Sequence, residues 1–385
     1  MDLAPKRIAI LMSLNRLYDR QVIRGIARFV QSRTRWQIYV EEDPADKLPI
    51  LSAWRGDGVI ADLDDSRLFQ AIGRMKVPIV GIGRVEAPYC LPRKVITVRS
   101  DDQLIGQWAA DHLVELGLKH YAYCGLPRRG PDPWVRARYD AFRSRLNELG
   151  FDCLNYGGRH FAARNWSNML STLSQWLKVL PKPIGIMACN DSRARHILTA
   201  CLVNGWRVPD DVAVIGVDND EMMCDLAIPS LSSIALGTEQ MGYAAAELLE
   251  RCLVQGEVAE REIVVPPMDL ISRRSTETFG VADPIIARAS KYIRDHASEP
   301  VSVDEIARYA RVSRSTLDAR FMKTLKRSVH DELKRMRLQI ARRLLLTTKL
   351  SIAEVAQRSG FSSDAYMNHV FRREFGTTPG VFRQR

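Results

Sequence analysis

A duplicated pattern in the last part of the chain constrains its fold more than any other feature. The segment SVDEIARYARVSRSTLDARF, starting at Ser302, recurs in plan forty-nine residues later as SIAEVAQRSGFSSDAYMNHV. Ser302 and Glu305 return as Ser351 and Glu354. In each pair the serine can accept a hydrogen bond from the amide three residues on, and the glutamate can reach back to the serine amide, which makes a capping box. A short helix is therefore predicted to begin after each serine.

A turn follows each predicted helix, at Ala310-Arg311-Val312 in the first copy and at Ser359-Gly360-Phe361 in the second. Gly360 tolerates a left-handed backbone, and Ser313 and Ser362 are predicted to cap the next helix. A helix, a tight turn and a capped helix together place the second helix in the major groove of DNA. Helical hairpins that only pack on each other are the alternative.

The charge distribution favours DNA binding. Residues 281–385 contain 21 Lys and Arg against 11 Asp and Glu, whereas the whole chain contains 56 and 45. The first 280 residues are therefore close to neutral, and almost all of the net charge of +11 surrounds the duplicated pattern. Such a basic segment attracts phosphates and predicts an affinity that falls steeply with salt. Double-stranded operator DNA is the expected partner.

Between the two copies, the stretch from Val329 to Thr347 places apolar side chains at three- and four-residue steps, which predicts one amphipathic helix. It would hold the two recognition helices so that they enter successive major grooves, roughly 34 Å apart. Side chains near the start of each recognition helix are expected to read bases, and two later arginines to bind phosphate. A plain solvent-exposed role is the alternative for any single one. The predicted DNA-binding residues are Arg314, Ser315, Thr316, Asp318, Asp364, Tyr366, Asn368, His369, Arg372 and Arg373.

These residues resemble the AraC/XylS family of transcription regulators, whose two helix-turn-helix units and linking helix are followed by TTP-x-x-[FY]-R. The stretch from Thr377 to Arg383 matches that ending. Arg320 departs from the family pattern, since its position is more often apolar. The resemblance implies an all-α DNA-binding domain, and operator DNA, RNA polymerase and a second copy of the chain as partners.

The first 275 residues follow a different plan, in which short apolar runs alternate with helical stretches. Examples are RIAILMSL before YDRQVIRGIARFV, and IGIMACN before DSRARHILTACLVNG. This alternation is typical of parallel α/β sheets, and the length exceeds that of one ordinary domain. We expect two α/β lobes with a cleft in residues 1–273, a polar linker in 274–283, and the DNA-binding domain in 284–385. Asp283 and Pro284 would start the first helix of that domain.

The loops after the strands lack the known signatures of enzymes. They contain no G-x-G-x-x-G fingerprint, P-loop lysine, nucleophile elbow or metal-spaced cluster. We therefore expect no enzymatic activity, cofactor or metal site, although a sugar-modifying enzyme fused to a DNA-binding domain is the alternative. The seven cysteines form no C-x-x-C pair and indicate reduced thiols in a cytoplasmic protein. The apolar run IAILM is too short for a signal peptide or a membrane span.

These loops do carry polar side chains where ligands bind in parallel sheets. Carboxylates and amides can bind adjacent hydroxyls, and an aromatic ring can cover the apolar face of a sugar. Helix capping is the alternative for each, above all for Asp64 and Asp191, which precede predicted helices. The polar side chains after predicted strands are Asn15, Tyr18, Asp19, Asp62, Asp64, Asn190, Asp191 and Asp218.

Residues 7–275 resemble the effector domains of LacI/GalR-type regulators, which share the fold of periplasmic sugar-binding proteins. Arg138 in RYDAF, Asp191 in CND and Asp218 in VIGVD match three sugar-contacting positions of that family. The union of both parts, with segments such as YDRQV and GDGVIADLDD, resembles the family of xylose operon regulators. This implies D-xylose as effector and activation of pentose-catabolism genes, with a repressor or another sugar as alternatives. It also adds Asn15, Tyr18, Asp19 and Trp134 as candidates for the sugar pocket.

Overall fold

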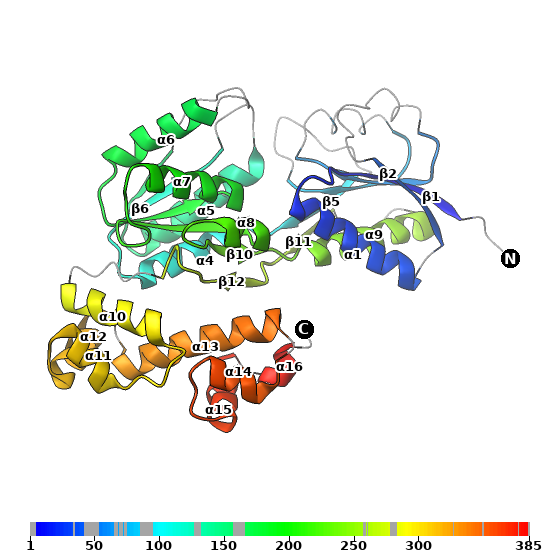
Figure 1. The fold of residues 1–385 in the computed structure, drawn as a ribbon. Helices are drawn as coiled ribbons and strands as arrows, with labels where there is room; N and C mark the ends of the chain where they lie inside the picture. Colours follow the sequence, from blue (N-terminus) through cyan, green and yellow to red (C-terminus); the bar gives the residue numbers. More distant parts are fainter. Residues whose placement is uncertain are drawn as a thin grey trace.

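Two α/β lobes and a helical domain make up the computed structural model of the chain (Figure 1). No helix in the described part of the chain combines the length and the apolar character needed to cross a bilayer. The described residues are 5–33, 35–41, 54–64, 68, 72, 75–84, 95–126, 132–156, 166–256, 259, 261–277, 283–325, 327–348, 350–375 and 377–383.

The first lobe contains a parallel six-stranded sheet in the order β11-β5-β4-β3-β1-β2. Every residue of β3 and β4 is buried, as expected for central strands of a parallel sheet. Helices α1 (Leu17–Arg33) and α9 (Thr238–Gln255) pack on this sheet. The strands are β1 (Lys6–Leu11), β2 (Trp36–Glu41), β3 (Gly58–Asp62), β4 (Ile79–Ile82), β5 (Val95–Ser100) and β11 (Glu262–Val265).

Two glycines allow α1 and α9 to touch along their backbones. A Cβ atom at Gly25 would lie 1.9 Å from the carbonyl oxygen of Glu239, and one at Gly242 would lie 1.9 Å from that of Val22. No other side chain fits at either position without moving a helix. This close packing fixes the start of α1 beside the carboxyl ends of the strands.

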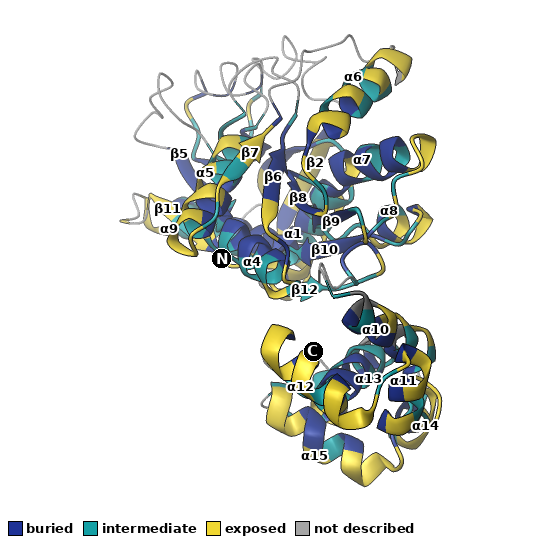
Figure 2. Cartoon of the chain, turned by 90° about the vertical axis from the view of Figure 1, so that its left-hand side faces the viewer, coloured by how far each residue is buried: buried dark blue, intermediate teal, exposed yellow. Residues whose placement is uncertain are grey.

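The second lobe has a sheet in the order β12-β10-β9-β8-β6-β7, parallel except for β12, which runs antiparallel to β10. Its central strands are buried (Figure 2). The strands are β6 (His120–Cys124), β7 (Cys153–Asn155), β8 (Ile184–Ala188), β9 (Val212–Asp218), β10 (Ser232–Ala235) and β12 (Asp269–Ile271). The helices are α4 (Asp102–Glu115), α5 (Pro133–Glu148), α6 (Trp166–Val179), α7 (Asp191–Val203) and α8 (Glu221–Leu226).

The chain passes between the lobes three times: after β5, between β10 and α9, and between β11 and β12. Three parallel connections form a hinge about which two rigid lobes can close on a ligand. The predicted two-lobed α/β fold class is confirmed, together with an all-α domain that follows it.

The helical domain has two cores that meet on α13, the helix predicted between the copies. Leu333 and Met336 of α13 belong to one core, and Leu338 and Ala341 belong to the other. The prediction of one amphipathic helix here is confirmed. The helices are α10 (Pro284–His296), α11 (Val303–Ala310), α12 (Arg314–Leu325), α13 (Val329–Thr347), α14 (Ile352–Arg358), α15 (Asp364–Phe375) and α16 (Pro379–Arg383).

Candidate functional site

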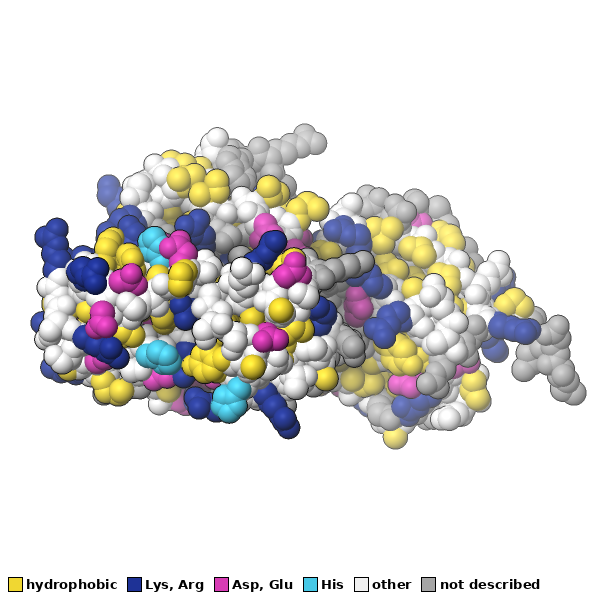
Figure 3. All heavy atoms as spheres, turned by 60° about the horizontal axis from the view of Figure 1, so that its bottom comes forward, with side chains coloured by type: hydrophobic (Ala, Val, Ile, Leu, Met, Phe, Trp, Pro, Cys, Tyr) yellow, Lys and Arg dark blue, Asp and Glu magenta, His cyan; other side chains and the backbone are white. Residues whose placement is uncertain are grey.

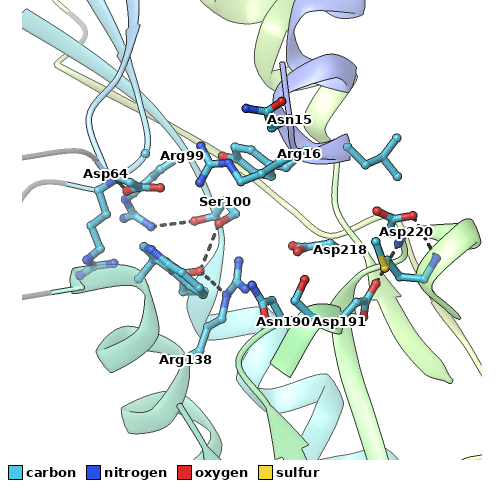
Figure 4. A pocket seen from close by; sticks show the side chains of 18 residues that line it. Asn15, Arg16, Asp64, Arg99, Ser100, Arg138, Asn190, Asp191, Asp218 and Asp220 are labelled. Carbon is cyan, nitrogen blue, oxygen red and sulfur yellow. Dashed lines mark hydrogen bonds and ion pairs between the residues drawn. The ribbon is translucent and has the colours of Figure 1, made fainter. Parts of the chain in front are cut away.

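Polar side chains from both lobes line a cavity of about 160 Å³ between them (Figure 4). Sites for drug-sized ligands typically measure about 300–1,000 Å³, so this one suits a smaller molecule. The start of α1 and the ends of β3 and β5 contribute from the first lobe. The second lobe contributes the starts of α5 and α7 and the end of β9.

Six of the seven predicted pocket residues line this cavity, namely Asn15, Tyr18, Trp134, Arg138, Asp191 and Asp218. Asp19 does not, which corrects that part of the prediction. Its fully buried carboxylate forms an ion pair with Arg16, whose Nε and Nη2 lie 2.6 and 2.9 Å from the two oxygens. Arg16 lines the cavity instead and also binds Asp62 at 2.5 Å. The sequence signal for Arg16 was its place in the first strand-end loop, beside Asn15.

Arg138 is buried on α5 and held from two sides. Its Nε donates to Oδ1 of Asp102 at 3.0 Å, and its Nη1 donates to the carbonyl oxygen of Cys189 at 2.6 Å. The hydroxyl of Ser100 donates to the same Asp102 oxygen at 3.1 Å. Because these contacts fix the guanidinium, its position in the cavity is set before any ligand arrives.

Asp102 is a cavity residue that the sequence analysis missed. It is only 1 % exposed, yet its Oδ2 has no hydrogen-bond partner in the described structure. A buried carboxylate oxygen without a donor is costly, and Asp102 lines the cavity. A ligand hydroxyl is the kind of donor it lacks. The preceding residue, Asp101, caps α4 through the Leu104 amide at 3.0 Å, so the pair of aspartates can be taken for a plain helix start.

Asp218 lies at the end of β9 near the centre of the cavity (Figure 4). Its φ of 112° is in the region that favours glycine, and such backbone strain concentrates at binding sites. Within the described part of the chain no group donates a hydrogen bond to its carboxylate. Burial raises the pKa of Asp218 to about 6, although the positive charges of Arg138 and Arg16 oppose the rise.

Asp191 is held mainly by the protein itself. Its Oδ2 accepts from the Asp220 amide at 2.8 Å, and its Oδ1 accepts from the Ser233 hydroxyl at 2.6 Å. It is not a helix cap, because Asn190 caps α7 through the Arg193 amide at 2.9 Å. Burial, followed by the charge of Asp218, raises the pKa of Asp191. Asp191 therefore shapes the turn after β9 and lines the cavity with what remains of its surface.

Two aromatic side chains add apolar surface to this polar cavity. Trp134 starts α5 and lies beneath the Arg138 guanidinium, whose central carbon is 4.8 Å from the ring centroid. Tyr18 is half-buried near the start of α1, and burial raises its pKa. Carboxylates, a guanidinium and ring faces together suit a small neutral molecule with several hydroxyl groups, because each hydroxyl can both donate and accept.

The helical domain contains both predicted capping boxes. The Ser302 amide donates to Glu305 at 2.8 Å, and the Ser351 amide donates to Glu354 at 2.8 Å. Gly360 has the left-handed backbone that the sequence allows, with a φ of 81°, and Arg311 in the first turn is also left-handed, with a φ of 60°.

One predicted cap is wrong. Ser313 caps α12 through the Thr316 amide, but Ser363 rather than Ser362 caps α15 through the Tyr366 amide. The turn has five residues between Arg358 and Asp364 in the second unit, against three between Ala310 and Arg314 in the first, and two adjacent serines made the sequence ambiguous.

The first recognition helix, α12, presents Arg314, Ser315 and Thr316 to solvent. Asp318 is half-buried, and its Oδ1 accepts from the Val329 amide at 3.2 Å, so it also fixes the start of α13. Arg320, which departs from the family pattern, binds Asp283 at 2.5 Å. That ion pair ties α12 to the residue that caps α10 and explains why an arginine fits there.

The second recognition helix, α15, presents Asp364, Tyr366, His369, Arg372 and Arg373 to solvent. Asn368 is half-buried, and its side-chain amide donates to the Asp364 carbonyl at 3.0 Å. A hollow formed by Asn368, His369, Arg372, Arg373 and Thr378 offers cationic and amide donors of the kind that DNA requires. Lys, Arg and His side chains are spread over this side of the helical domain (Figure 3).

Family models match three parts of the chain. A model described as the XylR N-terminal domain matches residues 7–97, and one for a periplasmic binding protein-like domain matches residues 110–276. A helix-turn-helix domain model matches residues 306–385. The fold therefore corresponds to a ligand-binding region followed by a DNA-binding domain.

Relatives match along nearly the whole chain. The xylose operon regulatory protein of Escherichia coli K12 is 38 % identical over 381 residues, covering 98 % of this chain and 96 % of the relative. The protein of the same description from Haemophilus influenzae is 33 % identical over 378 residues, covering 98 % of both chains.

Solved structures agree with these relatives. The structure of the xylose-binding transcription activator xylR is 38 % identical and superposes with a TM-score of 0.69, covering 100 % of this chain and 99 % of that one. A complex of the transcriptional regulator CelR with cellobiose, at 21 % identity and a TM-score of 0.58, shares the fold over 70 % of this chain and 84 % of that one. The chain therefore belongs to the family of xylose operon regulatory proteins, which are transcription regulators.

Proposed function

We propose that this chain binds D-xylose between its lobes and activates pentose-catabolism genes in response. The proposal rests on the full-length similarity, at 38 % identity, to a protein described as the xylose operon regulatory protein. The cavity of about 160 Å³, to which both lobes contribute aspartates and arginines, supports it.

In this proposal Asn15, Tyr18, Trp134, Arg138, Asp191 and Asp218 contact the sugar, and Asp102 and Arg16 join them. Asp218 and Asp102 accept hydrogen bonds from hydroxyls, and Arg138 donates to them. Trp134 and Tyr18 cover the less polar face of the ring. Lobe closure around the sugar then changes how the DNA-binding domains meet their half-sites.

The exposed starts of α12 and α15 would read operator bases, and Arg372 and Arg373 would bind phosphate. We propose a homodimer, because lobe closure can then change how two DNA-binding domains sit on paired half-sites, and RNA polymerase as a further partner of an activator. A regulator of operator DNA would act in the cytoplasm. Of the expected division into residues 1–273, a linker at 274–283 and residues 284–385, the start of the linker is too early, because Ser275 and Thr276 are fully buried in the second lobe and the Ser275 hydroxyl donates to the Val214 carbonyl at 2.6 Å.

Calorimetric titration of the purified full chain with D-xylose tests the proposal, with L-arabinose, D-ribose and D-glucose as comparison sugars. Saturable binding that prefers D-xylose is the expected result. Binding of another sugar alone would overturn the effector and keep the sensor. Slow turnover of any sugar would overturn the regulator-only function.

A further inference from the structure

The last of the three connections between the lobes is short and ends directly on a strand. β11 pairs with β5 in the first lobe and β12 pairs with β10 in the second, so residues 266–268 form the whole crossover. The Met268 amide donates to the Ala235 carbonyl at the end of β10. Closure of the lobes must rotate the backbone here, because both neighbouring strands are fixed in their sheets.

The first two residues after this crossover are held by a side chain of the DNA-binding domain. Nη1 of Arg342, on α13, lies 3.0 Å from Oδ1 of Asp269, and Nη2 donates to the Leu270 carbonyl at 2.9 Å. The Arg342 side chain is only 15 % exposed. Burial raises the pKa of Asp269 although Arg342 opposes the rise, so loss of this partner would leave a poorly solvated carboxylate.

The same guanidinium also reaches the second helix-turn-helix unit. Its central carbon lies 5.9 Å from the ring centroid of Phe375, the last residue of recognition helix α15. Phe375 packs in turn on Phe371 and Phe382 of the second core. One side chain thus touches both the strand that follows the hinge and the helix expected to read the operator.

A second arginine of α13, Arg335, also feels charges from outside its own helix (Figure 1). Arg335 lies two turns before Arg342. Burial lowers its pKa, but the negative charges of Glu332 and, after it, of Glu277 and Glu115 raise the pKa overall. Burial and, to a smaller extent, the charge of Arg335 lower the pKa of His112 on α4 to about 4. Because α13 contributes to both cores of the domain, a shift at Arg342 moves the whole helix rather than one side chain.

We propose that the contact of Arg342 with Asp269 and the Leu270 carbonyl is the coupling element between the lobes and the DNA-binding domain. When the lobes close, the crossover rotates and changes the contacts that Asp269 and the Leu270 carbonyl make with Arg342. This change tilts α13 and α15 together. The Arg342 contact therefore determines the position that the second recognition helix, α15, takes when the lobes are closed. This inference rests on the proposed sugar response.

The test measures the coupling factor, which is the ratio of DNA affinities with and without saturating D-xylose. The full chain is titrated onto a labelled duplex that the wild-type protein has selected from random DNA, and anisotropy is recorded. Coupling factors between sites are typically roughly 5- to 150-fold. Arg342→Gln and Asp269→Asn should each reduce the factor to below about 3-fold, and the double variant should lose no more than either single one. Sugar affinity, measured by calorimetry, should stay within about 3-fold of wild type.

Arg145→Gln is the matched control. It removes an arginine–aspartate pair of similar geometry, 2.7 Å from Asp111, between α5 and α4 within one lobe. Its coupling factor should equal that of wild type. A wild-type factor in Arg342→Gln, with sugar binding intact, would overturn the inference and leave the proposed function standing. A wild-type protein whose DNA affinity responds to no sugar would overturn both.

Discussion

Asp218→Asn isolates the charge at the centre of the cavity. Asparagine keeps the size of the side chain and is among the residues that best tolerate a positive φ, such as the 112° found here. The carboxylate is proposed to accept hydrogen bonds from sugar hydroxyls, and a hydrogen bond to a charged group contributes about 1.5–3 kcal/mol. At pH 7.5 the variant should therefore bind D-xylose roughly 10- to 150-fold more weakly than wild type.

The stability of the sugar-free protein should change in the opposite direction. Burial raises the pKa of Asp218 from 3.8 to about 6, so the folded state binds more protons than the unfolded state between these values. The contribution of this group to stability then falls as pH rises from about 4 to 6. Since one pKa unit corresponds to about 1.4 kcal/mol, Asp218→Asn should stabilise the sugar-free protein at pH 7.5 by up to about 3 kcal/mol.

Calorimetry from pH 5 to 8 and thermal melts without sugar measure both effects. Wild-type affinity should weaken as pH falls through about 6, and the affinity of the variant should stay level. Asp225→Asn, at a side chain that is 73 % exposed on α8, is the control and should match wild type. Wild-type affinity in Asp218→Asn, or the same pH dependence in both proteins, would refute the reasoning.

Five further substitutions test other parts of the account. Asp102→Asn should lower the melting temperature, by the equivalent of up to roughly 3–5 kcal/mol, because it removes the charge beside a buried guanidinium; a gain in stability would contradict the geometry. Asn368→Ala should reduce the binding free energy by about 1–3 kcal/mol on the specific duplex only. Arg372→Ala should weaken binding to DNA of any sequence and reduce the slope of log affinity against log salt concentration by about 1. Anisotropy titrations measure both effects. Gly360→Ala should destabilise the helical domain by more than about 1 kcal/mol in urea unfolding, since its Cβ would lie 2.2 Å from a carbonyl oxygen, whereas Gly380→Ala meets nothing and should not.

The sequence was most informative where the physics is local. Capping boxes at Ser302 and Ser351 involve groups three residues apart, so pattern alone predicts their partners. The three-and-four spacing likewise predicted α13 with its observed ends, Val329 and Thr347. Apolar runs such as those of β3 and β8 could be recognised because central strands of a parallel sheet are buried along their whole length.

The site was harder to predict because its contacts join distant parts of the chain. Asp19 and Arg16 both follow β1, and only the packed structure shows that the arginine faces the cavity and the aspartate lies behind it. Asp102 sits in an acidic helix start that looks like capping, and its free oxygen appears only once Arg138 is placed beside it. The edge strands β7 and β12 were not predicted, since strands of three residues carry too little pattern.

The central claim is that the binding of sugar and the binding of DNA by this protein are thermodynamically coupled. The most direct test is a calorimetric titration with D-xylose in the absence and in the presence of saturating operator duplex. Linkage requires that a sugar which strengthens DNA binding by some factor must itself bind more tightly by the same factor when DNA is present. The account predicts tighter sugar binding on DNA, by the coupling factor measured from the DNA side. An identical sugar affinity with and without the duplex would contradict it.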